Sequence, residues 1–362
     1  MSQLSSHIFS LLLIFISLLS LIHPSNSTNL HSIKFRSPNL YPEGLAYDPT
    51  SQHFLLGSLH GNNFISVSDT GVTETLTLIS PEIPPNSTIL GLSVDNLRRR
   101  LLAAVNINGS PFLASFHLHR TSLDLHFLSH LPSTGVSNGV TFDSHGNAYV
   151  TNSKENFIWK LDLNGTVSIL SKSPIFTQFP VDHTSPYSYC GLNGVVYINT
   201  KEYLLVVQSN TGKMFKVDAI DGTSKVVILP EELTLADGIT VRDDGVVVVV
   251  SMKSAWFLKS DDSWAQGEVI DKIALDEEGF PTSVTIGRRG RVYVVYGYVQ
   301  EGIKGILEER EWFRIEEIVS KRENEEESML WPFMLIGLGL VYFLFWKFQM
   351  GQLVKDVDRK RA

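Results

Sequence analysis

Side chains that carry oxygen recur at one position of a short repeated motif. The motif is a variable residue, then usually Gly, then alternating apolar and small residues that often end in Asp. Its copies begin at Glu43, Leu90, Asn138, Asn193, Asp237 and Thr282. Two carboxylates and two amides brought together would form a hard, all-oxygen site, which suits Ca²⁺. Because no Cys or His occupies the variable position, zinc and copper are disfavoured.

The spacing of the copies indicates how the fold brings these residues together. Successive copies begin 47, 48, 55, 44 and 45 residues apart, and a period of about 40–50 residues built from strands is typical of a propeller. In each copy a second β-branched or aromatic run follows the motif, such as Ala148 to Val150 or Val246 to Val250. We therefore predict an all-β fold, a six-bladed β-propeller over residues 28–320 with four strands per blade.

In such a ring the innermost strand of every blade lines a central channel, so equivalent residues lie at the same height. Glu43, Asn138, Asn193 and Asp237 are thereby predicted to converge, with Leu90 and Thr282 completing the ring. The strand at His31 to Ser37 precedes the first motif and has no blade of its own. We expect it to pair with the last blade, because closing the ring removes exposed sheet edges.

A simpler interpretation of the motif remains open at this stage. Asn-Gly and Asp-Gly are common turn dipeptides, and in a turn the polar residue would cap a loop and bind nothing. Four oxygen-bearing residues in register with one repeat favour the binding site.

The longest interval, between the third and fourth copies, contains an additional loop from Phe176 to Tyr189. A long loop beside a channel position is a candidate lid or substrate wall. Its Asp182 and His183 are candidate catalytic residues, and an ordinary polar surface loop is the alternative.

Composition narrows the class of partner. The 362-residue chain has a formal net charge of −8, which argues against nucleic acid and for a cation or a neutral small molecule. The single cysteine, Cys190, allows no internal disulfide. We expect a monomeric propeller that binds a small-molecule substrate.

Both ends of the chain indicate the secretory pathway. Leu11 to Ile22 is an apolar run followed by small Ser25 and Ser27, which predicts a signal peptide over residues 1–27, with a retained anchor helix as the alternative. Glycosylation sequons, which make a glycoprotein the expectation, begin at Asn26, Asn86, Asn108 and Asn164.

The C-terminal segment predicts a membrane anchor. Met329 to Trp346 contains no charged residue, so we predict a charged linker over 321–328, a transmembrane helix over 329–348 and a cytoplasmic tail over 349–362. Because the basic residues follow the span, the propeller is expected in the lumen or outside the cell, as a single-pass type I protein. Arg359 to Arg361 resembles a retrieval signal of the endoplasmic reticulum. We therefore expect the protein in the membrane of the endoplasmic reticulum or of a later secretory compartment.

The motifs themselves resemble a known family. PEGLAYDP, SNGVTFDSHGNAYVTN, LNGVVY and ADGITV, between residues 38 and 300, are similar to blade starts of the calcium-dependent senescence-marker-protein/gluconolactonase (regucalcin) family. Diisopropyl-fluorophosphatases and, more distantly, paraoxonases share the pattern. The chain also resembles the plant membrane-tethered, calcium-dependent phosphotriesterase-like branch.

The resemblance implies roles for individual residues. In the family, residues at the matching positions hold a catalytic Ca²⁺. The resemblance therefore implies that the ion is held by Glu43, Asn138, Asn193 and Asp237. Asn138 would instead contact the substrate if it behaves as in the gluconolactonases. The sugar-contacting arginine of the gluconolactonases and the paraoxonase histidine pair have no clear match. In the last copy Ser283 stands where some members have Asn.

Two functions follow from the sequence as expectations. The first is a calcium-dependent hydrolase of esters, lactones or organophosphates, with the metal as Lewis acid, Asp237 as base or nucleophile and Asn138 in the catalytic site. The second is a non-enzymatic, membrane-tethered propeller that binds a ligand or partner and contains a structural calcium. The fold alone does not choose between them.

Overall fold

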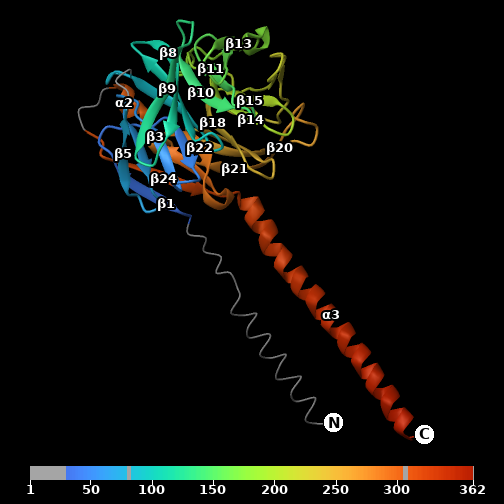
Figure 1. Ribbon diagram of the computed structural model, residues 1–362. Helices are drawn as coiled ribbons and strands as arrows, with labels where there is room; N and C mark the ends of the chain where they lie inside the picture. Colours follow the sequence, from blue (N-terminus) through green and yellow to red (C-terminus); the bar gives the residue numbers. More distant parts are fainter. Residues whose placement is uncertain (1–29, 80–82, 305–308, 362) are drawn as a thin grey trace. The chain divides into compact units, whose positions relative to one another are not determined.

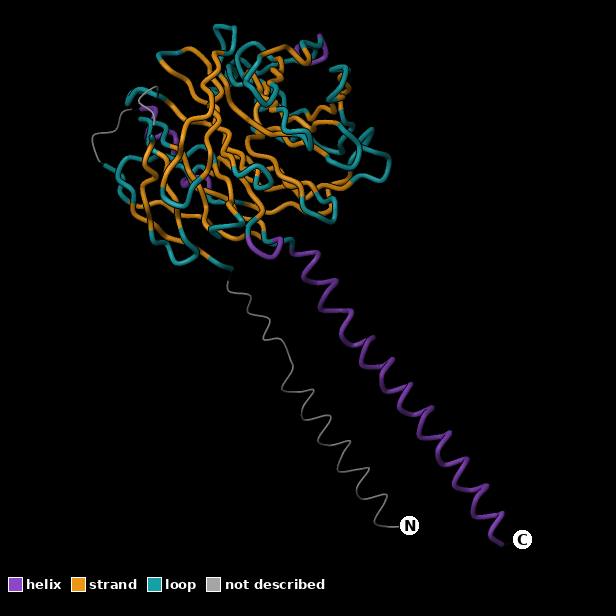
Figure 2. Tube along the Cα trace, viewed as in Figure 1, coloured by secondary structure: helices purple, strands orange, loops and turns teal. Residues whose placement is uncertain are grey.

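The computed structural model describes residues 30–79, 83–304 and 309–361, without the side chains of 323–334, 356 and 361. The predicted signal peptide of residues 1–27 lies outside this part. The chain divides into two units, Met1–His31 and Ser32–Ala362, and the second contains every strand described below. Figures 1 and 2 show that this unit is built of strands and loops with short helical turns, followed by one long helix.

Four sheets have four strands each, and each runs antiparallel from an innermost to an outermost strand. Their strands are β10 (Ser137–Phe142), β11 (Ala148–Asn152), β12 (Phe157–Leu161) and β13 (Val167–Ser171); β14 (Leu192–Ile198), β15 (Tyr203–Gln208), β16 (Met214–Asp218) and β17 (Ser224–Val226); β18 (Ala236–Val241), β19 (Val247–Ser251), β20 (Ser254–Lys259) and β21 (Glu268–Ala274); and β22 (Pro281–Ile286), β23 (Val292–Tyr296), β24 (Trp312–Ile318) and β1 (Ser32–Arg36).

The fifth sheet has eight strands and corrects the prediction of six separate sheets. Its strands are β2 (Leu45–Asp48), β3 (His53–Gly57), β4 (Phe64–Val67), β5 (Thr73–Leu78), β6 (Thr88–Asp95), β7 (Arg100–Ile107), β8 (Ser110–Leu118) and β9 (Ser122–His130). Two antiparallel four-stranded halves, β2–β5 and β6–β9, join where Thr77 and Leu78 of β5 pair parallel with Ser122 and Leu123 of β9. Some backbone N–H and C=O groups of the two outer edge strands are thus hydrogen-bonded to each other. The structure has four blades and one double-width sheet.

The innermost strands form a closed ring. β2, β6, β10, β14, β18 and β22 contact one another in that order, and β22 contacts β2. The first strand closes the ring as predicted, because β1 pairs antiparallel with β24 in the sheet of β22 and β23 (Figure 1).

The hydrophobic core lies between neighbouring groups of four strands. One cluster packs Phe35, Phe54, Tyr293 and Phe313 where the first and last groups meet. Middle strands are buried on both faces, as in β19, where every residue is buried, which explains the unbroken valine run Val246 to Val250.

Helices are short within this strand-rich region. The structure has 3-10 turns η1 (Pro174–Thr177), η2 (Glu277–Gly279) and η3 (Arg288–Gly290) and the helix α2 (Val299–Lys304). The predicted membrane span of residues 329–348 falls within α3 (Lys321–Arg361). In the parts of helices that the structure describes, none has the length and apolarity required to cross a bilayer. The side chains of residues 329–334 of the predicted span lie outside the described part.

A β-bulge sits at the motif in five of the six innermost strands. The register shifts between Ser137 and Val140, between Leu192 and Val195, and between Ala236 and Ile239, and also within β6 and β22. The variable residue and, in all but β22, the glycine after it are the residues left out of the pairing. The dipeptides are therefore parts of strands and not turns, and the bulge re-aims the variable side chain.

The glycine that follows is required by close packing between neighbouring innermost strands. A Cβ on Gly91, Gly139 or Gly194 would lie 2.2, 2.4 or 2.2 Å from the carbonyl oxygen of Asn138, Asn193 or Asp237, the next variable residue in the ring. In the last copy Ser283 replaces the glycine, and Thr282 instead donates its hydroxyl to the Pro42 carbonyl (3.2 Å), which links the ring's last strand to its start.

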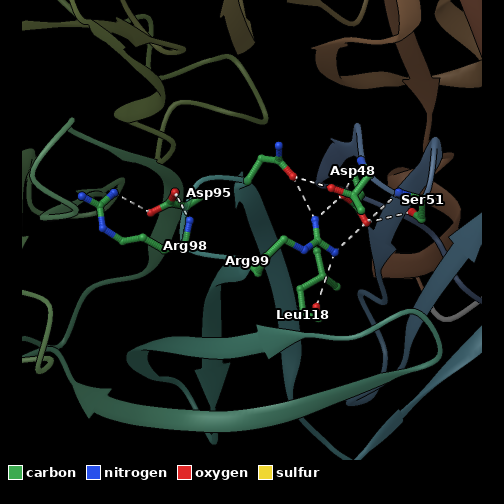
Figure 3. Close-up of polar contacts among 8 residues, drawn as sticks. Asp48, Ser51, Asp95, Arg98, Arg99 and Leu118 are labelled. Carbon is green, nitrogen blue, oxygen red and sulfur yellow. Dashed lines mark hydrogen bonds and ion pairs between the residues drawn. The ribbon is translucent and has the colours of Figure 1, made fainter.

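The aspartate that ends the motif is structural. Asp48 and Asp95 are buried at the far ends of β2 and β6 from the variable residue. Asp48 accepts from Ser51 (2.8 Å) and forms an ion pair with Arg99 (2.6 Å), whereas Asp95 accepts from Arg98 (3.1 Å) (Figure 3). Burial raises the pKa of Asp48, but the hydrogen bonds from Arg99 and Ser51 outweigh it and lower that pKa overall. These contacts fix the turns after β2 and β6.

The close packing predicts that a methyl group at a motif glycine destabilises the ring. Gly194→Ala should reduce the free energy of unfolding by about 1–3 kcal/mol, the usual cost of overpacking, because its Cβ meets the Asp237 carbonyl. Ser283→Ala, which changes the equivalent position where a Cβ is already accommodated, is the matched control. Urea unfolding curves of both variants measure the difference, and equal midpoints would contradict the packing account.

Candidate metal centre

The four predicted ligand positions come together at one end of the channel. Glu43, Asn138, Asn193 and Asp237 all line a cavity of about 400 Å³, and all four also line a smaller cavity of about 60 Å³ that continues between the innermost strands. Asn138 and Asn193 are 6% and 5% exposed, and the two acids are half-buried. Each residue comes from the motif of a different innermost strand, as the repeat predicts.

The two remaining ring positions have other roles. Leu90 is buried and adds an apolar surface to the larger cavity. Thr282 is buried, and its hydroxyl is engaged with the Pro42 carbonyl. The polar part of the ring is therefore the arc from Asn138 through Asn193 to Asp237, with Glu43 across the last motif.

Both amides are held in one orientation by serines. Asn138 Nδ2 donates to Ser153 Oγ and Asn193 Nδ2 donates to Ser209 Oγ, each at 3.0 Å. The amide oxygens, rather than the amide nitrogens, are then available to a cation or a substrate in the cavity that both residues line.

The two acids share a desolvated environment without a basic partner. Burial raises the pKa of Glu43 to about 7. Burial, followed by the charge of Glu43, raises the pKa of Asp237, and a hydrogen bond from Asn193 offsets only part of this. No positive group contributes to either shift, so at neutral pH the pair favours a proton or a cation between its carboxylates.

The larger cavity combines this polar floor with apolar walls. Its walls include Leu59, Val136, Leu235, Met252, Phe280, Val299 and Ile303. The loop between β13 and β14 contributes Tyr187 and Tyr189, and the Tyr187 ring meets Phe280 edge-on with centroids 5.9 Å apart. Gln300 of α2 donates to the Tyr187 hydroxyl, which ties the loop to the opposite wall.

That loop is a wall as predicted, but its candidate catalytic residues lie elsewhere. Asp182 and His183 are exposed and do not line the cavity. Asp182 instead accepts hydrogen bonds from the backbone and hydroxyl of Thr184 (2.9 and 2.6 Å), which is a turn-forming role.

Sequence reasoning missed the serines and the cysteine of the floor. Ser153 and Ser209 each follow a second strand at the same register, one residue beyond the partner of the residue before the motif, and that shared position was the available signal. Cys190 lines the cavity and is free. Burial, together with the charge of Asp237, raises the pKa of its thiol to about 12, so it stays protonated and is a poor nucleophile.

The donor set fits a calcium ion better than a transition metal. Within the described ranges no cluster of three or more His, Cys, Asp or Glu residues is arranged to hold a metal. Two carboxylates and two oriented amide oxygens remain, and such hard oxygen donors suit Ca²⁺ with places left for water or substrate.

Comparison with known proteins supports the fold. No family model matches the chain, and no curated protein matches it by sequence. Several solved structures match it in fold. The major allergen Mala s 1 of Malassezia sympodialis is 18% identical with a TM-score of 0.65, covering 79% of this chain and 95% of the allergen. Virginiamycin B lyase from Staphylococcus aureus is 12% identical (TM-score 0.53; 80% and 99% covered). A protein provisionally assigned as a gluconolactonase is 15% identical (TM-score 0.54; 81% and 94% covered). The shared property is the propeller fold.

The raised pKa of Glu43 predicts how pH affects the metal-free protein. In the folded state the Glu43 carboxyl keeps its proton up to about pH 7, whereas in the unfolded state it releases the proton near pH 4.5. The contribution of Glu43 to stability is therefore fully present below pH 4.5 and is lost as the pH rises through 7. Removing the group in Glu43→Gln should flatten this decline. Thermal unfolding in EDTA between pH 5 and 8 tests it, and parallel profiles for the two proteins would show that Glu43 titrates normally.

Proposed function

We propose that the protein is a calcium-dependent hydrolase of small esters, lactones or organophosphate triesters with substantial apolar groups. The observation that carries the proposal is the cavity of about 400 Å³ whose floor is formed by Glu43, Asn138, Asn193 and Asp237 and whose walls are apolar. A cavity of this size, with few polar groups at one end, is typical of small-molecule sites.

The floor supplies the groups that such a reaction needs. Glu43 and Asp237 would hold Ca²⁺ through their carboxylates, and Asn193 through its amide oxygen. When bound, the ion supplies Lewis-acid polarisation of a carbonyl or phosphoryl oxygen. The ion would also supply positive charge beside the two desolvated carboxylates, since no positive group contributes to the pKa shift of either one.

Asp237 is the residue best placed to act on substrate. Its carboxylate belongs to the cavity floor, and its raised pKa is typical of a group that takes up a proton. Asp237 is proposed as general base or nucleophile, and Asn138 as a ligand or substrate contact that stabilises developing negative charge.

The walls favour a substrate without many hydroxyl groups. Phe280, Met252 and Ile303 present apolar surface to the cavity, and its one basic lining residue is Lys154 among the described residues. Apolar substituents gain about 25 cal/mol per Å² on leaving water, whereas sugar hydroxyls would lose hydrogen bonds to water there. The solved structure provisionally assigned as a gluconolactonase supports hydrolysis in a propeller of this kind.

A non-enzymatic propeller with a structural calcium is the second candidate. The four floor residues belong to four different motifs, and an ion bound by them would cross-link the ring. This candidate predicts calcium-dependent stability without turnover, which separates it from the hydrolase.

The proposed ligand set predicts a calcium-dependent rise in thermal stability. Binding to the native state stabilises it by mass action, so millimolar CaCl₂ should raise the midpoint of the full-length wild type at pH 8. Glu43→Gln keeps an oxygen but loses a charge and should lose most of that rise. Glu278→Gln, in the exposed turn η2, is the matched control. An undiminished rise in Glu43→Gln would place the calcium elsewhere.

The proposed role of Asp237 predicts that chemistry and calcium binding separate. Asp237→Asn keeps an oxygen donor but removes the base, so turnover of aryl esters or lactones should fall on the order of 10²-fold or more, and calcium affinity should fall less. Steady-state rates and a calcium titration on one preparation give both values. If excess calcium restores the rate, Asp237 is only a ligand, and if the wild type turns over none of these substrates, the binding propeller is the better account.

A further inference from the structure

Two buried serine hydroxyls connect the asparagines of the floor to the next innermost strand. Ser153 Oγ donates to the Leu192 carbonyl (2.7 Å), and Ser209 Oγ donates to the Ala236 carbonyl (2.6 Å). Leu192 and Ala236 are the residues directly before Asn193 and Asp237. Each serine therefore contacts one floor residue and the backbone that leads to the next.

The single hydrogen of each serine hydroxyl determines the orientation of the amide beside it. A serine has one hydrogen to donate, and both serines use it on a backbone carbonyl. Toward the asparagine they can only accept, so the amide nitrogen faces the serine and the amide oxygen faces away from it. A flipped amide would set two acceptors against each other in a buried site, which costs about 1–3 kcal/mol.

The contacts form a continuous chain through three innermost strands. It runs from Asn138 through Ser153 to the backbone before Asn193, and then from Asn193 through Ser209 to the backbone before Asp237. Thr151 adds a second link, since it accepts from Gly139 N (2.9 Å) and donates to the Asn193 carbonyl (2.7 Å). The two amides and the backbone that leads to Asp237 thus share one hydrogen-bond network.

The next copy of the motif shows what changes when the floor residue is an acid. Ser153 and Ser209 each lie one residue beyond the strand partner of the residue before the asparagine. For Asp237 the preceding residue, Ala236, pairs with Ser251, so the equivalent position is Met252. The carboxylate of Asp237 has no N–H that needs an acceptor, and Met252 offers only a weakly accepting thioether sulfur. Serine accompanies the amides and a thioether accompanies the carboxylate.

We propose that Ser153 and Ser209 are positioning residues that hold the amide oxygens of Asn138 and Asn193 toward the calcium site by denying the amides any other orientation. The inference rests on the proposed calcium site, and it adds residues that the repeat alone did not identify. It requires that the serine matters only while the floor residue is an amide.

A double-mutant cycle on the full-length protein tests this requirement. Ser209→Ala should weaken calcium binding by about 10- to 100-fold, the usual effect of losing a partner that orients a ligand. In an Asn193→Asp background, where both side-chain atoms are oxygens, Ser209→Ala should change the affinity by no more than about 3-fold, because the pair is then uncoupled. Calorimetric titration with CaCl₂ gives the four dissociation constants.

Ser171→Ala is the matched control, because the Ser171 hydroxyl is also buried and donates to the Gly222 carbonyl of the following sheet (2.6 Å) without contacting an asparagine of the floor. It should leave calcium affinity unchanged. The pair Ser153→Ala and Asn138→Asp repeats the cycle one blade earlier, which keeps the proposal testable if a Ser209 variant does not fold.

The outcomes distinguish the positioning role from the calcium site itself. Equal losses in both backgrounds, or no loss in either, overturn the positioning role while leaving calcium binding intact. A wild type that gives no calcium heat overturns the metal site, and the positioning role with it. A loss confined to the asparagine background supports both.

Discussion

The close approach of neighbouring innermost strands at the motif is the constraint on which the rest of the structure depends. At four of the six junctions the carbonyl of a variable residue occupies the place where the preceding motif would carry a Cβ, as for Gly139 against Asn193 and Gly194 against Asp237. Only glycine permits this spacing at those four junctions, and the bulges in the innermost strands turn the variable side chains out of the pairing. Ring closure and site assembly are consequences of one local geometry.

The same geometry creates an electrostatic demand. It places two carboxylates, Glu43 and Asp237, in a poorly solvated cavity floor where burial raises both pKa values and no basic group opposes the rise. Serine hydroxyls meanwhile occupy the amide nitrogens of Asn138 and Asn193. An excess of oxygen donors over positive charge is the condition that a hard divalent cation satisfies.

The predictable parts of this protein were those written into the repeat. Recurrence in sequence identified the innermost strands and the four floor positions, and the unmatched first strand predicted the pairing of β1 with β24. The union of two four-stranded halves was not predictable, because the pairing of Thr77 with Ser122 depends on how two outer edges meet. Ser153 and Ser209 were missed because their role depends on where each hydroxyl hydrogen points. Residue type alone could not decide between a catalytic His183 and an ordinary surface loop, and the exposure of His183 supports the loop.

Three bulged positions, Asn138, Asn193 and Asp237, and Glu43, which lies two residues before β2, are proposed to converge as an oxygen site for calcium. The most direct test of this central claim is a crystal structure of the protein grown with CaCl₂, with anomalous difference density used to locate the ion. The account predicts one peak at the floor of the cavity, 2.3–2.6 Å from oxygens of Glu43, Asn193 and Asp237, with Asn138 beside it. A well-ordered floor without a peak, or a peak at any other set of residues, would contradict it.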